Sequence, residues 1–143
     1  MIKLKSYITA GSRYKLLFVK SDVEGVEYVD IGKQLSAVIE PSLEKKRLPL
    51  LADDELEKII RDHTIHDAEI GDYIAIQNIG ILFEPQLHFN LPLKFDSWAK
   101  IKVLIVRMEG TIQNDHFFLA GSVEDKYSIN LKEITYKTIY DEI

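Results

Sequence analysis

The stretch from Asp72 to Pro85, DYIAIQNIGILFEP, decides the fold prediction for this chain. Its first apolar run, Tyr73–Ile76, lacks helical spacing, which is typical of a strand that is covered on both faces. The polar residues Gln77 and Asn78 follow directly. In α/β proteins the carboxyl end of a central strand is where ligand-facing groups lie. The stretch therefore predicts a central strand with polar groups at its exit.

The segments on either side of this strand alternate between strand and helix patterns. Two further apolar runs, Tyr14–Lys20 and Ile101–Met108, predict buried strands. Helices are expected over 31–40, with Asp30 as the N-cap, over 53–65, and over 93–100. We therefore predict an α/β fold, a small three-layer sandwich with a largely parallel sheet whose central strands begin at Tyr14, Tyr73 and Ile101.

Two shorter features complete the predicted architecture. Val26–Asp30 alternates like a strand, but the link Ser21–Gly25 is too short for a parallel crossover, which favours an antiparallel hairpin or an interrupted unit. Near the end, Asp115–Ala120 and Lys126–Asn130 flank a turn and predict a C-terminal β-hairpin. The tail from Leu131 fits either a helix or a strand.

Composition places the chain among ordinary globular domains. It has 143 residues, 46% hydrophobic and 29% charged, so we expect a single α/β domain over 1–143. The net charge of −5 argues against general nucleic-acid binding. No apolar run approaches the length of a membrane span, no signal peptide is evident, and cysteine is absent. We expect a cytoplasmic protein without membrane contact.

The residues supply no complete catalytic, cofactor or metal site. A phosphate-binding P-loop needs GxxxxGK[ST], and the nearest imitation, Gly32-Lys33, is followed by Gln34 and lacks the upstream glycine. We interpret these residues as an ordinary helix start. We therefore expect no cofactor, and predict that the protein is not an enzyme.

Three weaker patterns leave alternatives open. His63 and His66 form a His-x-x-His pair that could bind a metal ion, but the chain lacks a third metal ligand at a diagnostic spacing. Asp72, Glu84 and His88 could converge at one sheet edge and hold a cation, as in a metal-dependent hydrolase or nuclease. The one basic cluster, Lys45-Lys46-Arg47, reads as a solvated loop, with a DNA-binding accessory subunit as its alternative.

The central stretch resembles the small P-loop proteins of BREX-type phage-defence systems, the BrxF group. The resemblance lies in an apolar strand, a polar pair, the pattern IxILFxPxL, a helix and a second apolar strand, here from Tyr73 to Gly110. The segments YKLLFVK and GVEYVDIGKQLS resemble the family's first strand and the strand and helix after its nucleotide loop. Together these features span most of Tyr14 to Ala120.

Two departures from the family pattern decide what the resemblance implies. Only Ser21–Gly25 stands where the family's phosphate loop and helix would lie, and Gln77 stands where its magnesium-binding acid would be. An amide lacks the negative charge that a magnesium site uses. The resemblance therefore implies a degenerate P-loop-NTPase-like fold that does not hydrolyse ATP.

The implied function is a non-catalytic accessory subunit of a bacterial anti-phage defence complex, docked on a larger ATPase or effector. A homodimer through an edge strand is a further alternative. The candidate interface consists of polar residues at the strand exit and of aromatic and loop residues nearby: Gln77, Asn78, Phe83, Glu84, Pro85, Phe117 and Phe118.

Overall fold

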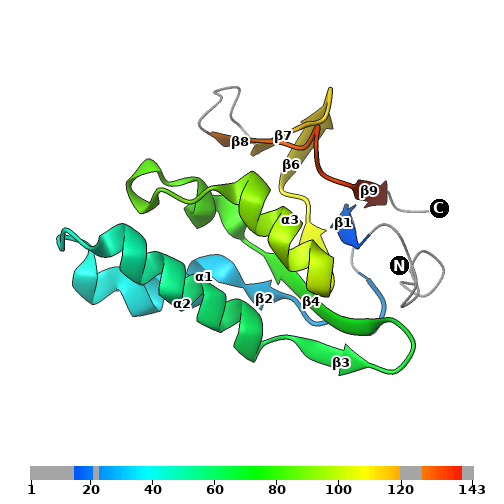
Figure 1. Ribbon diagram of the computed structural model, residues 1–143, viewed down its shortest axis with the longest axis horizontal. Coiled ribbons are helices and arrows are strands. Elements are labelled where there is room, and N and C mark those ends of the chain that lie inside the picture. The colour runs from blue at the N-terminus through cyan, green and yellow to red at the C-terminus, as the bar shows by residue number, and fades with distance from the viewer. Residues whose placement is uncertain (1–14, 21–22, 120–126, 140–143) are drawn as a thin grey trace.

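A computed structural model of the chain describes residues 15–20, 23–119 and 127–139 (Figure 1). The described strands are β1 (Leu16–Val19), β2 (Val29–Asp30), β3 (Ile65–Asp67), β4 (Gly71–Gln77), β5 (Val103–Arg107), β6 (Gly110–Gln113), β7 (His116–Leu119), β8 (Ser128–Asn130) and β9 (Tyr136–Ile139). The described α-helices are α1 (Ile31–Ile39), α2 (Leu48–Asp62) and α3 (Leu91–Ile101). Three 3₁₀ turns join them: η2 (Glu40–Ser42), η3 (Ile79–Phe83) and η4 (Pro85–Leu87).

The main sheet is largely parallel, as predicted. Its strands lie in the order β2-β4-β5-β1-β9, all neighbours on this path are parallel, and β3 pairs with β4 in the antiparallel direction. The interior strands β4, β5 and β1 are the three apolar runs expected to be central. The ambiguous C-terminal tail contains strand β9, which pairs with β1. The coarse fold prediction, an α/β domain around a largely parallel sheet, is confirmed.

The described helices all pack on one face of this sheet. The side chains of Phe18, Ile74 and Leu104 point to that face and are almost fully buried with the apolar sides of α1, α2 and α3. On the opposite face, Leu17 and Ile105 are equally buried, and the described residues packed there belong to strands and connecting segments. Among the described residues the helices thus form one layer, and the three-layer sandwich is not seen.

Of the two arrangements predicted for the first two strands, the interrupted unit is found and the antiparallel hairpin is not. β1 and β2 are separated in the sheet by β5 and β4, so they form an interrupted unit and no hairpin. β2 is only Val29 and Asp30, which pair with Ile76 and Gln77 at the carboxyl end of β4. In the described residues between β1 and β2 there is no helix.

The predicted N-cap of α1 is confirmed, but α3 and α2 both begin before their predicted starts at residues 93 and 53. Asp30 caps α1 by accepting a hydrogen bond from the Lys33 backbone N–H at 2.9 Å, and Asn90 caps α3 in the same way. Helix α2 begins at Leu48, one residue before Pro49, so the acidic residues from Asp53 lie in its interior and not at its start. Proline is favoured in the first turn of a helix because N–H groups there have no acceptor within the helix, so no hydrogen bond is lost where proline lacks its N–H.

A second, antiparallel sheet, β6-β7-β8, lies beside α3 (Figure 1). The predicted pairing of β7 with β8 is confirmed, although the turn at 121–125 lies outside the described residues. The strand β6 was not predicted; it joins β7 through Asn114 and Asp115, whose φ angles of 51° and 58° fit a type I′ turn. Phe117 of β7 is fully buried and stacks on Phe18 at 5.7 Å, which anchors this sheet to the core.

Candidate functional site

Asn78 links the carboxyl ends of β2, β4 and β5 to the start of α1. This residue adopts the left-handed conformation (φ 54°, ψ 55°) directly after β4. Its side-chain Nδ2 donates to Asp30 Oδ1 at 2.8 Å, and its backbone oxygen accepts from the Gly32 N–H at 3.0 Å. Its backbone N–H donates to the carboxylate of Glu109, which follows β5. One residue thus ties together β2, β4, the start of α1 and the exit of β5.

These contacts occupy the N-terminus of α1, where phosphate binds in many α/β proteins. The backbone N–H of Gly32 donates to Asn78, and that of Lys33 donates to Asp30. The hydrogen bond from the Lys33 backbone, followed by the one from Asn78, holds the pKa of the Asp30 carboxyl below its ordinary value. A carboxylate therefore already sits where an incoming anion would have to bind, and it would repel that anion.

A hollow of about 470 Å³ lies between the β4–α3 connection and β8. Three predicted interface residues line it: Phe83, Glu84 and Pro85. Glu84 and Pro85 are exposed, whereas Phe83 is 5% exposed and contributes a wall that stacks on Phe117. The loop segment from Phe83 to Pro85 therefore presents a carboxylate and a proline ring to solvent over an aromatic base.

The remaining predicted interface residues lie in different settings. Gln77 is half-buried at the end of β4, and Asn78 is exposed but tied into the hydrogen bonds described above. Phe117 belongs to the core, because its exposed fraction is 0%. Phe118, on the opposite side of β7, is half-buried and stacks on His116 at 6.1 Å.

The suspected cation ligands are not brought together. Asp72 lies at the start of β4, where its Oδ1 contacts His66 Nδ1 at 2.8 Å, while Glu84 and His88 follow the opposite end of the strand. At about 3.3 Å per residue, β4 alone separates them by more than 10 Å. His63 contacts the carbonyl oxygen of Ile59 through its ring at 2.9 Å. In the described ranges, no three His, Asp or Glu side chains are grouped to hold a metal ion.

The basic cluster Lys45-Lys46-Arg47 is exposed in the connection between η2 and α2. Its exposure agrees with a solvated loop. It lines none of the hollows described for this protein.

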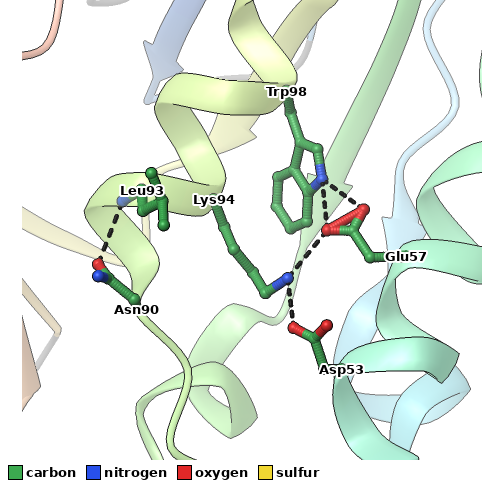
Figure 2. Close-up of polar contacts among 6 residues, drawn as sticks. All are labelled: Asp53, Glu57, Asn90, Leu93, Lys94 and Trp98. Atoms are coloured by element: carbon green, nitrogen blue, oxygen red, sulfur yellow. Dashed lines mark hydrogen bonds and ion pairs between the residues drawn. The ribbon is translucent and has the colours of Figure 1, made fainter. Parts of the chain in front are cut away.

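A second polar arrangement, which was not predicted from the sequence, joins α2 to α3 (Figure 2). Lys94 Nζ lies 2.5 Å from Asp53 Oδ1 and 2.9 Å from Glu57 Oε1, and its side chain is 13% exposed. The indole N–H of Trp98 donates to both oxygens of Glu57, at 3.0 and 3.1 Å. Lys94 also lies over the rings of Phe89 and Trp98 at 5.9 and 5.8 Å.

Burial by itself would lower the pKa of Lys94, but the hydrogen bonds and charges of Asp53 and Glu57 outweigh it and raise the pKa. Lys94 is therefore a protonated structural cation and not a nucleophile. Lys102, just after α3, is the opposite case. Burial lowers its pKa, and its Nζ donates to Thr64 Oγ1 at 2.8 Å.

Comparisons of this chain with protein-family models, with curated proteins and with solved structures found no match. Within the described residues, no helix has the length and apolarity needed to cross a membrane.

Proposed function

We propose that this protein is a non-catalytic subunit of a bacterial anti-phage defence complex, which acts in the cytoplasm by docking on a larger ATPase or effector protein. The observation that carries the proposal is the set of hydrogen bonds that Asn78 and Asp30 make at the N-terminus of α1. The backbone N–H groups of Gly32 and Lys33, which could otherwise bind an anion, are already bonded to the Asn78 carbonyl and the Asp30 carboxylate. A helix N-terminus whose N–H groups are already bonded suits a scaffold protein better than a nucleotide-binding site.

The defence setting rests on the sequence resemblance to the BREX-type P-loop group. We further propose that the fold is a degenerate form of the P-loop fold. In that fold a phosphate loop and helix follow the first strand. Here the described residues between β1 and β2 include no helix, and the parallel order β2-β4-β5-β1-β9 keeps β1 in the sheet interior. Both features support a scaffold from which the phosphate loop is missing.

Affinity purification of the native protein from its host tests this function. We expect stoichiometric recovery of a larger defence protein, identified by mass spectrometry and by gene neighbourhood. The mass of the purified complex also shows whether one or two copies of this chain are present. Recovery of the protein alone, as a clean monomer, would contradict the proposal.

A nucleotide-binding assay supplies an independent check. Isothermal titration with MgATP is expected to give no heat of binding, and purified protein is expected to release no phosphate from ATP. An intact P-loop ATPase serves as the positive control under the same conditions. Saturable MgATP binding would overturn the non-catalytic part of the proposal.

A further inference from the structure

Three neighbouring hollows surround the connection between β4 and α3. The first, of about 320 Å³, lies between α1 and this connection; the second is the hollow of about 470 Å³ next to β8; the third, of about 490 Å³, lies between α3 and the segment after β8. The first two share Glu84 in their linings, and the last two share Asn90 and Pro92. They therefore form one interrupted groove, which we call the acidic groove.

The acidic groove combines an apolar base with carboxylates. Ile39, Leu43 and Leu87 line its first part, and Leu43 is 53% exposed although it is a large apolar side chain. Phe83 and Phe89 line its second part. Ile39, Leu87 and Phe83 are only 2–5% exposed and form the floor of the groove, so the apolar side chains that a partner can cover are Leu43 and the half-buried Phe89.

The charges along the groove are mostly negative. Its lining includes the carboxylates of Glu40, Glu84, Asp96 and Glu133, and the only lysine in these linings is Lys132. Asp96 is partly balanced by Lys100, at 3.2 Å. The carboxylates of Glu40, Glu84 and Glu133 make no hydrogen bond or ion pair with another described residue. Complementary charges across an interface determine which partner is accepted and speed its association.

From this geometry we infer that the acidic groove binds a segment of the larger partner in which lysine or arginine residues alternate with apolar ones. The apolar side chains of that segment occupy the hollows, and its cations lie against Glu40, Glu84 and Glu133. This inference rests on the proposed function and specifies the chemistry of the partner.

A charge-reversal variant tests the inference on the complex recovered with the native protein. Glu40→Lys combined with Glu84→Lys reverses two exposed charges of the groove. The matched control, Glu24→Lys with Asp54→Lys, makes the same charge change at two exposed residues that line none of the hollows. Circular dichroism and thermal melting establish that both double variants fold like the wild type.

We expect the groove variant to lose affinity for the partner by about tenfold or more, and the control to keep it within about twofold. Raising the NaCl concentration should weaken the wild-type complex, since exposed charge pairs are screened by salt. A photo-crosslinking amino acid at Pro85 then identifies the bound segment. The crosslinked partner peptide is expected to carry Lys or Arg next to apolar residues, and reversing those charges should restore binding to the groove variant.

The outcomes separate the two proposals. If the wild type recovers no partner, the proposed function fails, and the groove inference fails with it. If the wild type and the groove variant recover the same partner equally, or if the crosslinks at Pro85 map to an acidic segment, only the groove inference is overturned.

Discussion

The backbone oxygen of Asn78 accepts a hydrogen bond from the backbone N–H of Gly32 at 3.0 Å, although the two residues are far apart in the sequence. This contact brings the first turn of α1 against the exit of β4. A Cβ atom on Gly32 would lie 2.4 Å from Asn78 Nδ2 and 3.1 Å from the Asn78 oxygen. The absence of a side chain at Gly32 is therefore what permits the approach.

The first prediction concerns Gly32→Ala. Alanine normally stabilises a helix relative to glycine, but here the clash with Asn78 should dominate and lower the free energy of unfolding by about 1–3 kcal/mol. Urea denaturation followed by circular dichroism measures the change. Gly80→Ala is the matched control, because its Cβ would meet only Leu119 at an ordinary 3.8 Å. Equal stabilities for the two variants would refute the steric explanation.

The second prediction separates the backbone and side-chain roles of Asn78. Asn78→Ala loses the hydrogen bond to Asp30. It also forces alanine, which has a Cβ atom but no polar group to compensate, into the left-handed conformation. Asn78→Gly loses the same bond but adopts that conformation freely. We expect both variants to be destabilised, with alanine the worse by about 1 kcal/mol. A glycine variant as unstable as alanine, in the same urea experiment, would show that the backbone conformation contributes nothing.

The third prediction uses the titration of Asp30. Its pKa is lower in the folded protein, first because of the hydrogen bond from the Lys33 backbone and then because of Asn78. A carboxyl of this kind stabilises the fold above its unfolded pKa of about 4, and that contribution is lost as the pH falls through the folded pKa. Asp30→Asn keeps an N-cap side chain but cannot titrate. The decline in unfolding free energy from about pH 5 to about pH 2 should therefore be smaller in the variant. Parallel pH profiles would contradict this.

The fourth prediction compares two lysines with opposite pKa shifts. Lys94→Met removes the cation from between Asp53 and Glu57, so these carboxylates repel each other, and we expect a loss of about 1–3 kcal/mol at pH 7. This estimate is reduced because both carboxylates are almost half exposed. Lys102→Met instead removes a cation whose pKa is lowered by burial, so stability should stay level or rise.

Trp98 provides the measurement for this pair. It is the only tryptophan of the chain, and its indole N–H bonds to Glu57. Its fluorescence should therefore report both unfolding and any local change at the α2–α3 contact. We expect Lys94→Met to alter the emission of the folded state and Lys102→Met to leave it unchanged. Equal destabilisation by the two substitutions would contradict the opposite roles assigned to them.

Local patterns in the sequence were sufficient to predict the central strands and the helices α1 and α3. Buried strands show as apolar runs, and Asp30 is a preferred N-cap residue, so both signals lie within a few residues of the element. The same locality explains the error at α2. The acidic residues from Asp53 resembled a helix start, but tertiary packing of Leu48 and Ala52 extends the helix further back.

The candidate site was less predictable, because it depends on contacts between distant segments. No local sequence pattern around Asn78 predicts its hydrogen bonds to Gly32 and Glu109. The acidic groove likewise forms only because α1, α3 and β8 come together around the connection between β4 and α3. Two signals were present nonetheless. Asparagine tolerates the left-handed conformation at a strand exit. The Asn114-Asp115 pair between alternating residues is a hairpin signal that would have identified β6.

The position of β1 in the sheet has a consequence for biosynthesis. β1 pairs with β5 on one side and with β9 on the other, and Leu16 lies opposite Leu104 and Tyr136. A ribosome adds about 5–20 residues per second, so this apolar strand is made several seconds before either neighbour. The main sheet therefore assembles only late in translation, and a nascent chain halted before residue 136 leaves one side of β1 without its native partner, open to non-native association or to chaperones.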